Sequence, residues 1–103
     1  MNILILCIGS SRYGQIEEVK EFLHLAESNN FNVLYLALSV VVKPSPRTYI
    51  HSGFVEHMRL ACTELCPEYM VCNIALGARY QRNLEKALCV KVLDRTELLL
   101  SLI

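Results

Sequence analysis

Four short apolar runs alternate with segments of helical spacing, and this alternation restricts the fold more than any other feature. The runs are nearly continuous and lack the apolar–polar alternation of half-exposed strands. They therefore indicate strands of a parallel sheet that is covered on both faces. The runs span Ile3–Ile8, Asn32–Val42, Tyr69–Ile74 and Val90–Leu93. Apolar residues recur at helical spacing in Gln15–Ser28, Phe54–Cys66 and Ala78–Leu88.

The repeated order of strand and helix predicts an α/β fold, with a mainly parallel four-stranded sheet and helices on both faces. Asp94 follows the last run and is placed to cap a fourth helix. The chain has 103 residues, of which 53% are hydrophobic. That length is enough for one core but not for two. We therefore expect a single small domain over residues 1–103.

Charge and hydropathy exclude several classes of protein. Ten basic residues balance ten acidic ones, which argues against a protein that binds polyanions through its overall charge and leaves room for a local basic patch. No apolar run reaches the ~18 residues of a membrane span. The opening run also lacks the basic start and the cleavage site of a signal peptide. We expect a cytoplasmic protein without a membrane partner.

The cysteines predict neither a disulfide framework nor a metal site. Their number is odd, and an odd set in apolar surroundings is typical of a reduced chain. Cys62 and Cys66 are one helical turn apart, with His57 nearby, but structural zinc sites usually have four ligands. We interpret both as small apolar residues of a packed helix. The five cysteines are Cys7, Cys62, Cys66, Cys72 and Cys89.

The first apolar run ends in a glycine spacing that is typical of a phosphate-binding loop. Gly9 and Gly14 have that spacing, but Gln15 and Ile16 stand where the lysine and the hydroxyl residue are required. A nucleotide site here would depend on bare amides at a helix start, so a small nucleotide-binding α/β protein is one alternative. No nucleophile–base pair is evident, and we expect no catalytic residue and no enzyme activity in this chain.

A basic stripe follows the third predicted helix. Arg79, Arg82 and Lys86 are spaced i, i+3 and i+7 and so share one face, and Arg47 lies in an earlier loop. Arginine forks on such a face suit a phosphate backbone. An ordinary solvated face that includes Glu85 is the alternative, and spacing alone favours it.

The loop before the second predicted helix is crowded with special residues. Prolines favour an extended backbone here, and Ser52 is placed to cap the helix. Thr48, Tyr49 and Ile50 are expected to lie against the body of the domain. The residues of interest are Pro44, Pro46, Arg47, Thr48, Tyr49, Ser52 and Gly53.

Two long segments resemble HflX-type GTPases. The stretch KPSPRTYIHSGFVEHMRL is similar to that family's K-P-x-P-R-T-Y-I-G-S-G-K-V-E-E-L. The later stretch RYQRNLEKALCVKVLDRTELLL is similar to R-Q-Q-R-N-L-E-x-A-L-x-V-K-V-x-D-R-T-x-L-I-L. With EEVKEFLHLAESNNFNV, which fits the family's first helix and second strand, the resemblance covers nearly the whole chain. It identifies the chain as an N-terminal α/β domain, in which Leu98–Ile103 starts a helix that continues in the longer protein.

The resemblance implies a noncatalytic binding and regulatory domain. HflX-type GTPases associate with the large ribosomal subunit and are implicated in splitting or rescuing stalled ribosomes under stress. Ribosomal RNA and the GTPase domain of the longer protein are therefore the implied partners. GTP and magnesium belong to that GTPase domain, so no cofactor is expected in this chain. The candidate RNA-facing residues are Arg47, Arg79, Arg82 and Lys86.

Two single positions and one short stretch depart from the family pattern. His51 and Phe54 replace a glycine and a lysine, and Val40–Val42 replaces a polar, basic stretch. A glycine-rich helix start with a lysine beside it attracts anions, so these changes weaken an RNA contact at this edge. They also form an apolar patch that favours self-association. A stand-alone scaffold that has lost RNA binding, and that dimerises through Val40–Val42 or Leu98–Ile103, is the second alternative.

Overall fold

The protein is a three-layer α/β domain with an all-parallel sheet. The computed structural model describes residues 1–10 and 15–101. The strands are β1 (Asn2–Gly9), β2 (Asn32–Val40), β3 (Tyr69–Cys72) and β4 (Lys91–Leu93). They are ordered β2-β1-β3-β4, and every neighbouring pair is parallel. This confirms the predicted fold class.

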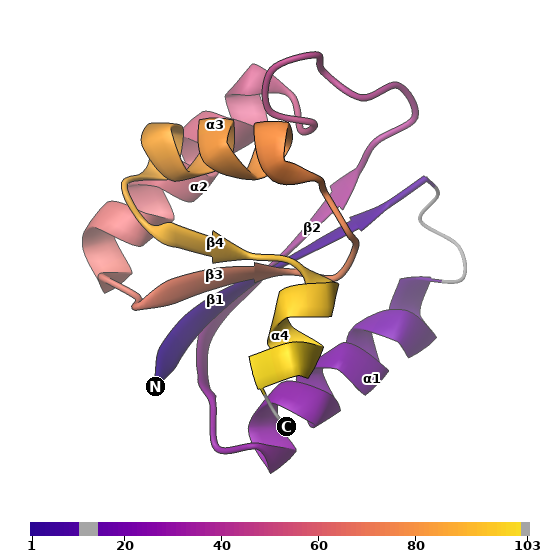
Figure 1. Ribbon diagram of the computed structural model, residues 1–103, viewed down its shortest axis with the longest axis vertical. Coiled ribbons are helices and arrows are strands. Elements are labelled where there is room, and N and C mark those ends of the chain that lie inside the picture. Colours follow the sequence, from indigo (N-terminus) through magenta and orange to yellow (C-terminus); the bar gives the residue numbers. More distant parts are fainter. Residues whose placement is uncertain (11–14, 102–103) are drawn as a thin grey trace.

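Two helices cover each face of the sheet. They are α1 (Gln15–Ser28), α2 (Ser52–Leu65), α3 (Ala78–Leu88) and α4 (Arg95–Ser101). Figure 1 shows α2 and α3 together on one face, with α1 and α4 on the other. Right-handed crossovers produce this division, because the chain moves to one side of β1 for β2 and to the other side for β3. Within the described residues, no helix is long and apolar enough to cross a membrane.

Strand β1 explains why the first apolar run shows no alternation. Leu4, Leu6 and Ile8 belong to the core beneath α2 and α3. Ile3, Ile5 and Cys7 belong to the core beneath α1 and α4. All six are buried, as expected for a central strand with a packed layer on each face.

The ends of the helices confirm one predicted cap and correct another. The Glu97 N–H donates to Asp94 Oδ1 at 2.9 Å, so Asp94 caps α4 as predicted. Ser52 is not a cap, because α2 begins at Ser52 itself and His51 holds the cap position without a side-chain hydrogen bond. At its other end, α2 stops at a left-handed Cys66, and Pro67 follows.

Two strands end earlier than the apolar runs indicate. β2 ends at Val40, although Val41 and Val42 continue the run. Val41 turns into the core and is buried, whereas Val42 is 84% exposed. β3 ends at Cys72, and the side chain of Asn73 takes over the pairing with β1, as described below.

Candidate nucleic-acid interface

The segment Lys43–Ile50, here named the motif loop, is closed by its own hydrogen bonds. Ser45 and Tyr49 form an antiparallel bridge in which each N–H donates to the other's carbonyl, at 3.0 and 3.1 Å. Thr48 Oγ1 donates to the Ile50 carbonyl at 2.8 Å. Pro46 lies in the turn inside this bridge. The prediction that it holds an extended backbone is therefore wrong, because the bridge folds the chain back on itself.

The motif loop is docked on α3. Ile50 is fully buried and Thr48 nearly so, which confirms that this part lies against the body of the domain. The rings of Tyr49 and Tyr80 meet edge to face, with centroids 5.3 Å apart. Asn83 Nδ2 donates to the Arg47 carbonyl at 2.7 Å. The two sequence segments that resemble the GTPases thus lie in direct contact.

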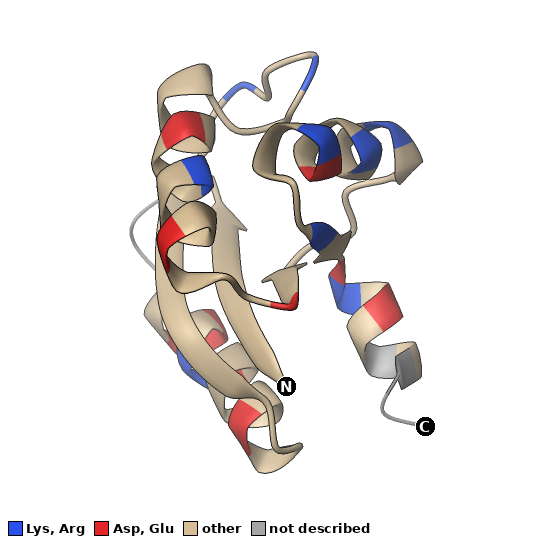
Figure 2. Ribbon diagram, turned by 90° about the vertical axis from the view of Figure 1, so that its left-hand side faces the viewer, with Lys and Arg blue, Asp and Glu red and all other residues tan. Residues whose placement is uncertain are grey.

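Docking places four cationic side chains on one side of the domain. Arg79, Arg82 and Lys86 are exposed along α3, and Arg47 is exposed in the motif loop beside that helix. We name these four residues the cationic surface. Figure 2 shows the basic residues of α3 and of the loop at the same end of the molecule. Within residues 1–10 and 15–101, none of the four forms an ion pair.

Glu85 does not neutralise the cationic surface. Its carboxylate turns toward the sheet, where Oε1 accepts the Val92 N–H at 3.2 Å. Gln81 on the same helix also faces inward, and its amide donates to the Val92 carbonyl at 2.6 Å. The polar residues between the cations therefore hold β4, and the cations face solvent.

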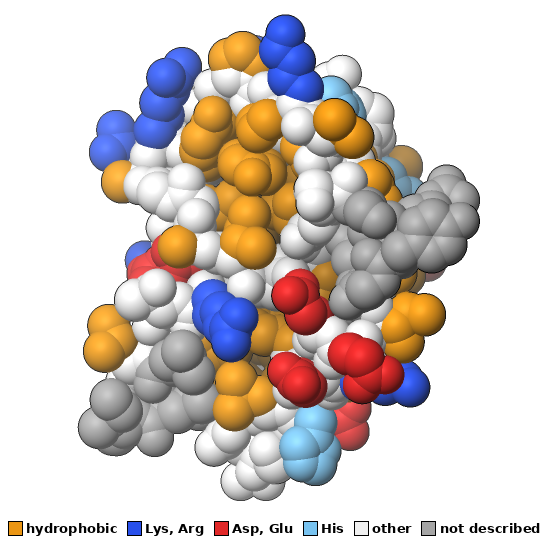
Figure 3. All heavy atoms as spheres, turned by 90° about the vertical axis from the view of Figure 1, so that its right-hand side faces the viewer, with side chains coloured by type: hydrophobic (Ala, Val, Ile, Leu, Met, Phe, Trp, Pro, Cys, Tyr) orange, Lys and Arg blue, Asp and Glu red, His pale blue; other side chains and the backbone are white. Residues whose placement is uncertain are grey.

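Charge is unevenly distributed over the carboxyl edge of the sheet. Figure 3 looks at this edge and shows an apolar hollow in its upper half, with Lys and Arg side chains around it. Most of the acidic side chains in the view gather in the lower half. The start of α2 lies at this edge, where His51, Ser52 and Gly53 are exposed. A Cβ added to Gly53 would meet nothing within 4 Å, so the fold itself does not require glycine there.

The crevice between β1 and β3 is partly filled by a side chain. Ligands of open parallel sheets bind where the strand order reverses, and here Asn73 occupies that place. Asn73 Oδ1 accepts the Ile8 N–H at 2.8 Å, and Nδ2 donates to the Ile8 carbonyl at 3.3 Å. The neighbouring cavity, about 230 Å³, is lined by Glu18 and Glu21, which repel phosphate, and by Arg95, which attracts it. Gly9 ends β1, and Gly14 lies outside the described residues.

The buried cysteines are poor nucleophiles. Burial, with a contribution from Glu18, raises the pKa of Cys7 to about 11. Burial also raises the pKa of Cys72 and of Cys62. Their thiols are protonated at neutral pH and lack the reactivity of a thiolate. Cys62 faces the core while Cys66 is exposed, and no metal-binding group of three His, Cys, Asp or Glu residues occurs in the described part of the chain.

Sequence reasoning missed the contact that assembles the candidate interface. Asn83 and Arg47 are 36 positions apart, and no local pattern predicts their hydrogen bond. Gly77 is the cap residue of α3 with a φ of +88°, a value that side chains rarely adopt. A lone glycine before a helical pattern was the available signal for that turn.

Comparison with known proteins agrees with the two motif segments. The family described as GTP-binding GTPase N-terminal matches residues 16–102. GTPase HflX of Magnetococcus marinus is 39% identical over 82 residues, which cover 80% of this chain and 19% of that protein. GTPase HflX of Chlamydia pneumoniae is 34% identical over 91 residues, covering 84% and 18%. The chain thus spans about a fifth of the length of these curated relatives.

A solved structure supports the fold. The crystal structure of the SsGBP and GDP complex superimposes with a TM-score of 0.75 at 20% identity, covering 99% of this chain and 28% of that one. At this identity the likeness is evidence for the fold alone. The family match and the curated relatives carry the assignment further: the chain belongs to the GTP-binding GTPase N-terminal family, as an N-terminal domain of the HflX type.

Proposed function

We propose that this domain is a noncatalytic binding and regulatory module that contacts ribosomal RNA of the large subunit. In this proposal it serves an HflX-like GTPase that splits or rescues stalled ribosomes in the cytoplasm under stress. One observation carries the proposal: the motif loop is docked on α3, so Arg47 lies beside Arg79, Arg82 and Lys86. The family assignment adds the GTPase context.

The chemistry of the cationic surface suits a phosphate backbone. Three of its four residues are arginines, whose planar forks bind phosphate oxygens in pairs. All four are exposed, so they reach a partner without first losing an internal ion pair. Contacts of this kind are made to the backbone and depend strongly on salt. Double-stranded RNA is recognised mainly through its shape and backbone, which a fixed row of cations can follow.

Binding, not chemistry, is the proposed activity of this chain. The crevice between β1 and β3 holds Asn73 beside side chains of both charges, and the buried thiols are protonated. We assign GTP and magnesium to the GTPase domain of the longer relatives. The domain would then orient the GTPase on the ribosome, with that domain and ribosomal RNA as its two partners.

Charge reversal on α3 tests the proposal. The chain is sedimented with purified large ribosomal subunits, alone and as the triple variant Arg79→Glu, Arg82→Glu, Lys86→Glu. We expect the parent to co-sediment at low salt and the triple variant to remain in the supernatant. Lys20→Glu on α1 is the control, because Lys20 is exposed on the other face of the sheet. Equal binding by the parent and the triple variant would reject the assignment.

A further inference from the structure

The outer edge of β2 is open. The Val41 N–H donates to the Gly9 carbonyl at 2.7 Å, so the backbone of Val41 faces β1. Backbone groups alternate sides along a strand, and the N–H and C=O groups of Leu36, Leu38 and Val40 therefore point away from β1. Among the residues that the structure describes, β2 pairs with β1 alone.

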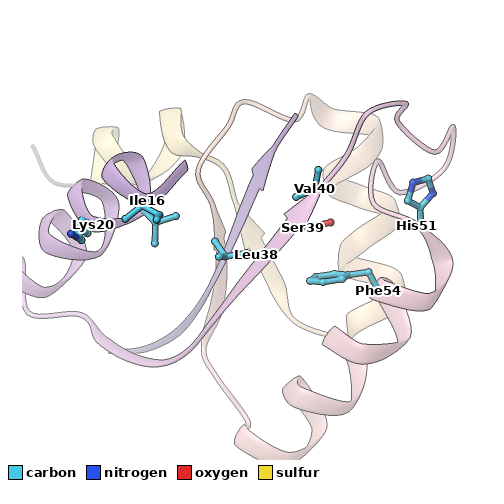
Figure 4. Close-up of a pocket in the computed structure, with 8 residues that line it drawn as sticks. Ile16, Lys20, Leu38, Ser39, Val40, His51 and Phe54 are labelled. Atoms are coloured by element: carbon cyan, nitrogen blue, oxygen red, sulfur yellow. The ribbon is translucent and has the colours of Figure 1, made fainter. Parts of the chain in front are cut away.

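Mainly apolar side chains flank this edge. A groove of about 760 Å³ follows the carboxyl-terminal half, with Ile16 and Val19 of α1 on one side and Phe54 of α2 on the other. Figure 4 shows β2 between these two walls. A second hollow of about 320 Å³ follows the other half, where Tyr35 and Leu60 are among its lining residues.

Only an extended strand satisfies both features of the edge. It alone supplies N–H and C=O groups at the spacing of Leu36, Leu38 and Val40. Its side chains would point alternately to the two sides of the sheet, and both sides are mainly apolar here, with Lys20 and His51 among the polar members of the lining. The structure therefore indicates what kind of segment covers the edge.

The edge is self-complementary, which points to a second copy. Natural edge strands usually carry lysine, proline or inward charges that prevent such pairing. The stretch Asn32–Val42 contains no charged residue and no proline. The register irregularity in β2 lies near its start, between the partners of Ile3 and Leu4, and leaves Leu36–Val40 regular. A two-fold axis brings the same patch together from both copies, so the groove of one copy meets the smaller hollow of the other.

We propose that β2 pairs antiparallel with β2 of a second copy and joins two four-stranded sheets into one continuous sheet. The interface is separate from the cationic surface, so the two proposals stand or fall independently. Two copies held this way carry two sets of Arg79, Arg82 and Lys86.

Light scattering over a range of concentrations tests the dimer. The mass of the parent should rise from 11.7 kDa toward twice that value and stop there. Leu38→Lys, at a side chain 49% exposed on the edge, should remain at 11.7 kDa. Leu100→Lys is the matched control, since Leu100 is 65% exposed on α4, and it should behave as the parent does. A monomeric parent, a mass that rises without limit, or loss of the dimer only in Leu100→Lys would overturn the proposal.

Amide hydrogen exchange gives a second readout that needs no variant. The N–H groups of Leu36, Leu38 and Val40 have no partner among the described residues of a single copy and should exchange quickly at low concentration. Pairing predicts that their exchange slows as concentration rises, while that of the inward-facing Ala37 and Ser39 stays slow throughout. Exchange at Leu36, Leu38 and Val40 that is independent of concentration would contradict the paired edge.

Discussion

The cationic surface and the β2 edge show how one small sheet presents two chemically different surfaces. The first consists of exposed charges on a helix and a docked loop, held in place by Asn83 and by the Tyr49–Tyr80 contact. The second has no charge along Asn32–Val42 and offers backbone groups and apolar walls. A surface of the first kind suits a polyanion in water, whereas the second suits a strand that brings its own hydrogen bonds.

The start of α2 lies between these two surfaces and carries the departures from the family pattern. Phe54 and His51 line the groove beside β2, where the resemblance places a lysine and a glycine. Phe54 thus adds apolar area beside the β2 edge, whereas a lysine at this position would have extended the cationic surface. The comparison predicts that the two surfaces respond to different substitutions.

The largest expected effect is that each of two variants loses one activity and keeps the other. The triple reversal at Arg79, Arg82 and Lys86 should lower affinity for large ribosomal subunits on the order of a hundredfold at low salt and leave self-association unchanged. Leu38→Lys should abolish self-association. The resulting monomer should bind large ribosomal subunits at least as tightly as a single copy of the parent does. Co-sedimentation and light scattering on both variants, with circular dichroism to verify folding, measure this. If either variant loses both activities while folded, the two surfaces are not separate.

Phe54→Lys should weaken the apolar β2 edge and add a charge next to the cationic surface. Phe54 is half-buried at the start of α2, and a lysine stem can cover the same apolar area while its ammonium reaches water. We expect weaker self-association and a salt slope of subunit binding steeper by about one. Phe54→Met is the uncharged control. A lysine variant with the salt slope and the mass of the parent would show that this position belongs to neither surface.

Asn83→Ala should have a moderate effect on both stability and binding. It removes the hydrogen bond to the Arg47 carbonyl, at a cost of about 1 kcal/mol in the free energy of unfolding. The motif loop then no longer holds Arg47 beside α3, and affinity for the subunit should fall about threefold. A double-mutant cycle with Arg47→Ala checks the mechanism. Strictly additive losses would mean that Asn83 does not act through Arg47.

The smallest expected effect concerns the Glu56–Arg59 pair on α2. A hydrogen bond from the Arg59 guanidinium lowers the pKa of the Glu56 carboxyl below its usual value. A carboxyl whose pKa is lower in the folded than in the unfolded protein stabilises the fold at pH values above its unfolded pKa. This stabilisation is lost as pH falls through the folded pKa. Glu56→Gln should therefore lower the melting temperature only slightly at about pH 7, since exposed pairs contribute little. The difference should shrink further as pH falls below the usual pKa of a glutamate. A difference that grows on acidification would contradict this sign.

Local patterns predicted the helices better than the ends of the strands. The bounds of α1 and α3 agree with the helical spacing to the residue, because each helix buries one apolar face against the sheet. The prediction for β2 ran on to Val42, since apolar character alone does not distinguish a strand from a buried turn. The start of α2 at Ser52 was missed because its cap residue, His51, makes no side-chain hydrogen bond.

The candidate sites could be predicted only in part. Helical spacing placed Arg79, Arg82 and Lys86 on one face, and all three are exposed there. Their relation to Arg47 depends on a contact between distant segments, which no spacing reveals. The apolar character of β2 was visible in the sequence, but its open edge follows from the strand order β2-β1-β3-β4. Strand order is a property of the packed sheet and not of any local pattern.

The most direct test of the central proposal is the salt dependence of binding between this chain and purified large ribosomal subunits. Four cations on phosphates predict that the logarithm of affinity falls with the logarithm of salt concentration at a slope of about −3 to −4. A slope of this size in the parent, and a shallower one in the Arg79, Arg82 and Lys86 charge reversal, would mean that the cationic surface is an RNA contact. Absence of binding at low salt, or binding that salt does not weaken, would contradict the account.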